Sequence, residues 1–231
     1  MPDSIVAFAD ALGTSSSALD EKTAFTFLNG LQAASRHLAP LLKRLQKHRG
    51  IGVRWFSDSI LMSARLSQDG NHAIEVIKNL AAVQGTYAFY GVLLRGAIVR
   101  GPHHHGPDID YGPALARAVG LEKEAGNAVR IILSRELVYD LTHNSALNPH
   151  VAVDLDDDTA FLDFLHFVDG AARRSLRQRL ETTFRALPES SDDRTRAKLQ
   201  WLAAYFNWKV KGRTIPFAST RRFTELGGAN A

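Results

Sequence analysis

The sequence contains no cysteine, which excludes several kinds of protein and site at once. Disulfide-stapled scaffolds, zinc sites built from thiolates and enzymes with a cysteine nucleophile all require that residue. Long hydrophobic runs are missing too, since none approaches the roughly 18 apolar residues of a membrane span. The N-terminus MPDSIVAF lacks the basic and apolar segments of a signal peptide. We therefore expect a cytoplasmic protein with no membrane partner.

Neither positive nor negative charge is strongly in excess. The chain has 28 Lys and Arg against 24 Asp and Glu, a net charge of +4. Basic residues cluster at 43–49 and 173–179, in segments typical of solvated helix faces. Neither cluster has the interleaved aromatic residues of a single-strand binding platform. The balance fits an anionic ligand, and we expect no nucleic-acid partner.

The chain is long and apolar enough to bury a substantial core, with 231 residues of which 45% are hydrophobic. It has no internal repeat and no low-complexity linker. We expect a catalytic core over residues 1–150 and a mainly helical C-terminal extension over residues 151–231, packed on that core.

The order of apolar patterns predicts the fold. A short apolar run, a long helical pattern ending near Gly50, a strand-like pair, a second helical pattern and another strand follow one another. This order predicts a mixed α/β (α+β) fold with a ferredoxin-like βαββαβ core. Further helices are expected near 113–125, 135–141, 171–187 and 192–209.

Two short apolar runs each contain one aspartate. SIVAFADALGTS carries Asp10 and continues into a small-residue turn, and RWFSDSILMS carries Asp58 in a predicted tight hairpin. A bare carboxylate inside an apolar strand is costly, which favours a functional role over chance strand-end aspartates. Two carboxylates beside a turn rich in backbone N–H groups suit divalent metal ions and a nucleoside triphosphate. A plain glycine turn is the alternative for Gly13.

Four motifs in order carry a family resemblance. FADALGTS, FSDSILMS, LRGAIVRG and YGPALARAVGLEKEA resemble the class III nucleotidyl cyclases, the adenylate and guanylate cyclase catalytic fold, over residues 4–134. The small form with a helical extension is most similar to the pyrimidine cyclases of the bacterial Pycsar anti-phage system. The resemblance implies conversion of UTP to cyclic UMP and pyrophosphate, and a separate effector that responds to the product.

The resemblance also assigns the metal and phosphate site. Asp10 and Asp58 would bind two Mn²⁺ or Mg²⁺ ions and act in catalysis, with the carbonyl oxygen of Ala11 as a further ligand. Backbone N–H groups would contact the β- and γ-phosphates from Leu12, Gly13 and Thr14.

Other implied nucleotide contacts lie on neighbouring segments. Arg54 stands where adenylate cyclases carry a base-reading lysine and would donate to a uracil carbonyl, and Phe56 follows on the same strand. Ile109 stands at the other base-reading position. Arg95 is a candidate for phosphate contact and Arg117 for the transition state, with a surface ion pair as the alternative for each.

The sequence departs from the family at the third helix. Aligned on Gly112, the family's asparagine and arginine positions fall on Ala116 and Gly120. A cytidylate or adenylate cyclase, or an inactive cyclase-like nucleotide sensor, therefore remains an alternative. The lack of a GGDEF-like hairpin argues against a diguanylate cyclase. The resemblance further implies a head-to-tail homodimer with active sites at the interface.

Three adjacent histidines, His103, His104 and His105, follow the fourth predicted strand. Three neighbours in a row cannot all face one ion. We interpret them as an exposed hairpin loop.

Overall fold

The structure is a computed structural model that describes residues 1–13, 21–67, 71–124, 128–142, 150–185, 187, 192–212 and 214–226. Within these ranges, eight strands form one sheet in the order β10-β8-β9-β7-β4-β1-β3-β2. Its first half is built from β1 (Asp3–Ala11), β2 (Gly52–Phe56), β3 (Ser59–Arg65) and β4 (Leu94–Pro102). Two helices connect these strands, α2 (Glu21–Arg49) and α3 (Asn71–Phe89).

This first half is the predicted βαββαβ core. The neighbours β4-β1-β3-β2 are all antiparallel, and β1 lies in the middle because both flanking strands pair with it. The predicted hairpin between β2 and β3 is also present, with a two-residue turn at Ser57 and Asp58. The predicted fold class is confirmed.

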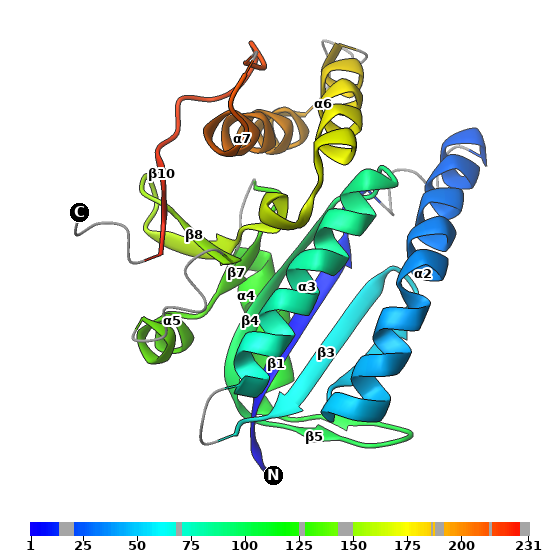
Figure 1. Ribbon diagram of the computed structural model, residues 1–231, viewed down its shortest axis with the longest axis vertical. Helices are drawn as coiled ribbons and strands as arrows, with labels where there is room; N and C mark the ends of the chain where they lie inside the picture. Colours follow the sequence, from blue (N-terminus) through cyan, green and yellow to red (C-terminus); the bar gives the residue numbers. More distant parts are fainter. Residues whose placement is uncertain are drawn as a thin grey trace.

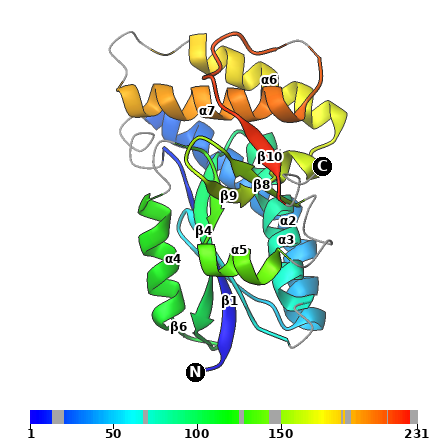
Figure 2. The same ribbon diagram turned by 90° about the vertical axis from the view of Figure 1, so that its left-hand side faces the viewer.

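Helices cover both faces of the sheet (Figure 2). Side chains alternate along β1, so Ile5 and Ala7 face the cluster packed under α2 and α3, whereas Val6 faces a cluster with Ala114 and Ala118. Those two alanines belong to α4 (Pro113–Glu124). A short hairpin joins β4 to α4 through β5 (His104–His105) and β6 (Asp110–Tyr111).

The rest of the chain adds strands as well as helices. The added strands are β7 (Ile131–Leu133), β8 (Val151–Asp154), β9 (Thr159–Leu162) and β10 (Phe223–Glu225). The added helices are α5 (Arg135–Leu141), the short helix η2 (Phe164–Phe167), α6 (Gly170–Arg185) and α7 (Asp193–Lys209). Since β8, β9 and β10 belong to the core sheet, the segment beyond residue 150 is not only helical. The division into a core and an extension stays a prediction.

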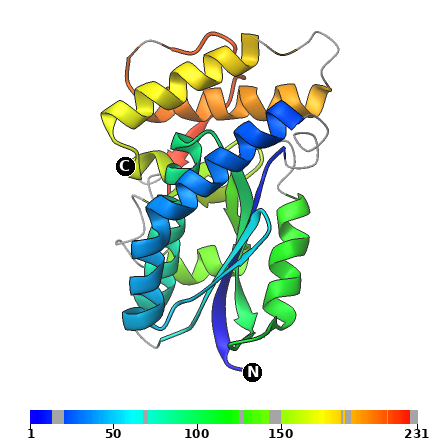
Figure 3. The same ribbon diagram turned by 90° about the vertical axis from the view of Figure 1, so that its right-hand side faces the viewer.

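Helices α6 and α7 lie across one end of the sheet (Figures 1 and 3). An aromatic cluster fixes α7 there, because Trp201 and Tyr205 pack edge-on against Phe161 of β9 at 5.2 and 5.3 Å between ring centroids. The indole N–H of Trp201 also donates to the buried carboxylate of Asp154, 2.8 Å away. A helix pinned by buried rings and a buried hydrogen bond has little freedom to move.

Among the described residues, no helix combines the length and the apolar character needed to cross a membrane.

Candidate active site

The strand β1 and the β2–β3 turn bring the two predicted aspartates together. Asp10 pairs in register with Ser59, the first residue after the turn. The Ser59 hydroxyl donates to Asp10 Oδ1 at 2.7 Å, and the Ala11 N–H donates to the Asp58 carbonyl oxygen at 3.1 Å. Ser57 has a positive φ of 52°, which tightens the turn that carries Asp58. The hairpin register thus fixes both carboxylates at the same end of the sheet.

A pocket of about 510 Å³ lies at this end. Of the residues predicted from sequence, it is lined by Asp10, Ala11, Leu12, Gly13, Asp58 and Arg95. Their convergence from three separate stretches of chain is the main feature of the site. Thr14, predicted as part of the phosphate turn, lies outside the described residues.

Arg95 lines the pocket from β4, where it pairs in register with Asp10 on the neighbouring strand β1. Its guanidinium forms an ion pair with Glu122 of α4, a residue that is only 4% exposed. Burial raises the pKa of the Glu122 carboxyl, the attraction of Arg95 opposes this shift, and the charge of Asp10 adds to it. Glu122 therefore holds Arg95 beside Asp10. No sequence motif marks Glu122 for this role.

Helices α6 and α7 close the pocket on its other side. Thr183 comes from α6, and Thr195 and Lys198 come from α7. Burial lowers the pKa of the Lys198 ammonium, and the nearby charge of Arg95 lowers it further. No motif in the sequence marks these three residues, which reach the pocket only because α7 packs over the sheet.

The donor set suits a hard divalent cation. Asp10 and Asp58 offer carboxylate oxygens, and Ala11, which lines the same pocket, has a backbone carbonyl. Within the described residues, no group of three or more His, Cys, Asp or Glu side chains could hold a metal ion. Two carboxylates are enough for Mg²⁺ or Mn²⁺ when substrate phosphates and water complete the shell. These residues therefore fit the predicted ions.

Arg54 does not line this pocket. It forms an ion pair with Asp110 of β6, and its Nη2 donates to the carbonyl oxygens of Gly106 and Pro107 at 2.6 and 3.2 Å. The residue that faces Arg54 is thus Asp110, whereas its neighbour Ile109 is 59% exposed. The role of Ile109 as the second base-reading position stays a prediction.

Two of the three histidines lie against the same carboxylate. His104 and His105 are exposed in the β5–β6 hairpin, as expected, but His103 corrects part of that interpretation. His103 is 1% exposed, so it does not belong to an exposed loop. Its Nε2 lies 3.3 Å from Asp110 Oδ1, and His105 Nδ1 lies 2.5 Å from the same oxygen. Burial lowers the pKa of His103. The lowered pKa of Asp110 reflects its contacts with His105 and Arg54, which outweigh the opposing effect of burial.

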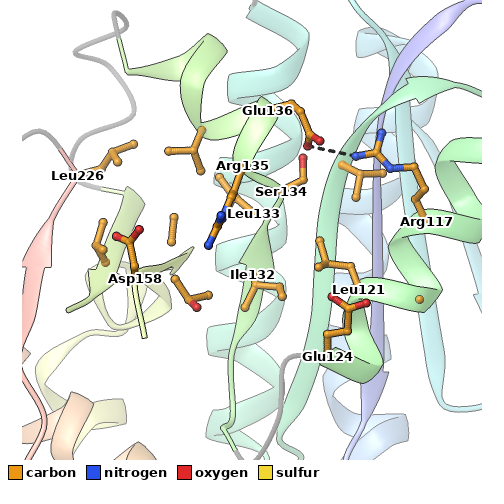
Figure 4. A pocket seen from close by; sticks show the side chains of 16 residues that line it. Arg117, Leu121, Glu124, Ile132, Leu133, Ser134, Arg135, Glu136, Asp158 and Leu226 are labelled. Carbon is orange, nitrogen blue, oxygen red and sulfur yellow. Dashed lines mark hydrogen bonds and ion pairs between the residues drawn. The ribbon is translucent and has the colours of Figure 1, made fainter. Parts of the chain in front are cut away.

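The two remaining predicted residues also lie away from the pocket. Phe56 ends β2 and is 43% exposed. Arg117 lines a different depression of about 860 Å³ between α4 and α5, where its Nη2 donates to Glu136 at 3.1 Å (Figure 4). Ala116 and Gly120, the positions of the two family residues, sit on the exposed face of α4.

Comparison with solved structures finds nucleotidyl cyclase domains. The chain is similar to the monomeric guanylyl cyclase domain of the RhoGC fusion protein from the aquatic fungus Blastocladiella emersonii, with 17% identity, a TM-score of 0.48, and coverage of 70% of this chain and 95% of that one. The adenylyl cyclase CyaB from P. aeruginosa gives 14% identity and a TM-score of 0.39, with coverage of 69% and 91%. No protein-family model matches the sequence. No curated protein matches it either. These similarities assign no activity to the chain.

Proposed function

We propose that this protein is a nucleotide cyclase that converts UTP to 3′,5′-cyclic UMP and pyrophosphate. The observation that carries the proposal is the pocket shared by Asp10 and Asp58, with the backbone of Leu12 and Gly13 beside them. Two carboxylates, a backbone turn and the cation of Arg95 are the groups that a metal-bound triphosphate needs around it.

The chain's own residues position the reacting atoms. Bound Mn²⁺ or Mg²⁺ would supply activation of the ribose 3′-oxygen and neutralisation of the phosphates. Asp10 and Asp58 hold these ions, and the Ser59 hydroxyl fixes the orientation of the Asp10 carboxylate. Arg95 attracts the phosphates from across the sheet, and Glu122 keeps it there. Holding the 3′-oxygen in line with the α-phosphate lowers the entropic part of the barrier.

Uracil recognition is assigned to Arg54. Its Nε and Nη2 are engaged by Asp110 and the loop carbonyls, whereas Nη1 makes no hydrogen bond to a described residue. A guanidinium is a donor only and suits the carbonyl oxygens of uracil. Phe56, on the same strand, offers an exposed ring near such a base.

The distance of this base site from the pocket's lining favours a dimer. Arg54, Phe56 and Arg117 lie outside the pocket of their own chain, so a second copy would bring them to it. We therefore propose a homodimer with the active sites at its interface. As second-messenger synthase of a Pycsar anti-phage system, the protein would act through a separate effector that binds cyclic UMP.

One observation supports a second candidate, an inactive nucleotide sensor. Ala116 and Gly120 are exposed on α4 and have no polar side chain, at the two positions where cyclases carry an asparagine and an arginine. The substitution Asp58→Ala separates the candidates, because it abolishes turnover by a cyclase and weakens only metal-assisted binding by a sensor.

The direct test is incubation of the purified protein with each of the four nucleoside triphosphates and Mn²⁺, with products identified by mass. We expect cyclic UMP and pyrophosphate from UTP. Cyclic CMP or cyclic AMP as the main product would keep the reaction and overturn the role given to Arg54. Bound nucleotide without any product would place the protein among the sensors.

A further inference from the structure

Lys198 is a half-buried cation on a helix face that carries large buried aromatic residues. It precedes Trp201 and Tyr205 by three and seven residues, so all three share the face of α7 that packs on the sheet. Trp201 and Tyr205 are 2% and 0% exposed. A lysine at such a position loses hydration, as the lowered pKa of Lys198 reflects. Its place is tolerable because the pocket, not the core, receives its ammonium group.

The ammonium of Lys198 is in direct contact with no acidic side chain among the described residues. No ion pair or hydrogen bond joins it to them, whereas Lys209 at the other end of α7 binds both Asp163 and Glu225. Arg95, the other cation of the pocket, is already paired with Glu122. The charges of Asp192 and Glu122 attract Lys198 without forming an ion pair, so the pocket holds one cation that no described carboxylate contacts.

The carboxylates of the pocket do not fill this role. Asp10 and Asp58 line the same space, yet neither forms an ion pair with Lys198, and both suit divalent ions. An anion with several charged oxygens would reach the metal ions and the lysine together. A triphosphate chain has that length and charge, and Thr195 and Thr183 add hydroxyl groups on the same wall.

We propose that Lys198 binds the phosphate chain of the nucleotide in the pocket of Asp10 and Asp58, within one and the same chain. The helices α6 and α7 are then a wall of the active site rather than an appended module. Lys198 contacts the substrate and, with Arg95 opposite, brackets the phosphates. This inference rests on the proposed function for the identity of the substrate, and the test separates the two.

The test measures binding and turnover in matched variants of the full chain. Lys198→Met removes the charge and keeps an unbranched stem, Lys198→Arg keeps a cation, and Lys211→Ala is the control for loss of an exposed positive charge outside the pocket. Binding of inorganic tripolyphosphate with Mg²⁺, and of uridine 5′-monophosphate, is measured by calorimetry. Thermal unfolding of each variant shows that it is folded.

We expect Lys198→Met to weaken tripolyphosphate binding about 10- to 100-fold, the loss of one charge-assisted contact, with little change for the monophosphate. Lys198→Arg should lie between Lys198→Met and the native chain, and Lys211→Ala should match the native chain. With UTP as substrate, the loss should appear mainly in KM.

The outcomes distinguish the two proposals. If the native protein turns over UTP and Lys198→Met binds tripolyphosphate as tightly as the native chain does, the role of Lys198 is overturned and the proposed cyclase activity stands. If Lys198→Met binds tripolyphosphate more weakly and the native protein makes no cyclic nucleotide, the phosphate site is supported and the proposed cyclase activity is rejected. Absence of tripolyphosphate binding to the native protein overturns the inference.

Discussion

The substitution Asp154→Ala tests how α7 is held over the pocket. Asp154 is fully buried, and its Oδ2 accepts hydrogen bonds from Trp201 of α7 at 2.8 Å, from Arg221 at 2.6 Å and from Arg130 at 3.1 Å. Arg130 is itself only 6% exposed. Removing the carboxylate leaves a buried indole N–H without its acceptor and a buried guanidinium with one acidic partner fewer.

The expected loss follows from these contacts. Breaking a buried ion pair from one side costs about 3 to 5 kcal/mol. Arg130 keeps two hydrogen bonds to Asp157, at 2.8 and 3.0 Å, which places the loss near the lower end, at about 3 kcal/mol. For a chain of 231 residues, this corresponds to a fall in Tm of about 6 to 12 °C.

Urea unfolding followed by circular dichroism measures the free energy of unfolding, with an unchanged m-value as the check for two-state behaviour. The matched control is Asp156→Ala, which removes a carboxylate paired with Arg222, a side chain that is 76% exposed. The control should change stability by less than about 0.5 kcal/mol. A loss below about 1 kcal/mol in Asp154→Ala would refute the reasoning.

Two further predictions concern stability. In β4, a Cβ at Gly96 would lie 2.1 Å from the Phe8 carbonyl oxygen of β1, so Gly96→Ala should cost at least about 2 kcal/mol by urea unfolding. Gly120→Ala, with open space around it in α4, should stabilise by about 0.5 to 1 kcal/mol; similar values for both variants would contradict the close approach of β4 to β1. Burial lowers the pKa of His150 to about 4, so the unfolded chain binds its proton first and stability falls as the pH drops from 6.5 toward 4. His150→Phe, which keeps the stacking on Phe167, should remove about 2 to 3 kcal/mol of the stability difference between pH 7 and pH 4.5, and an unchanged difference would show that His150 is not held neutral.

The core of the fold was predictable because its signals are local. The short apolar run in residues 4–11 and the short hairpin around Asp58 are recognised within a few residues of sequence. The apolar stripe of α2 likewise predicts its end near Gly50, and the helix ends at Arg49. Asp10 and Asp58 could be named from sequence because both lie in these local patterns.

The rest of the site depends on contacts between distant segments. Glu122 reaches Arg95 only when α4 packs on β4, and Lys198 reaches the pocket only when α7 crosses the sheet. The β5–β6 hairpin folds back so that Asp110 meets Arg54. No periodicity within one segment encodes such pairings, which are set by tertiary packing.

The most direct test of the account is Mn²⁺-dependent formation of cyclic UMP from UTP by the native protein and by Asp10→Asn, which keeps the shape of the side chain and removes its charge. Asp156→Asn, outside the pocket, serves as the control. We predict product from the native protein and from Asp156→Asn, and a loss of at least about 100-fold in Asp10→Asn. Equal rates in Asp10→Asn and the native protein would contradict the assignment of this pocket as the active site.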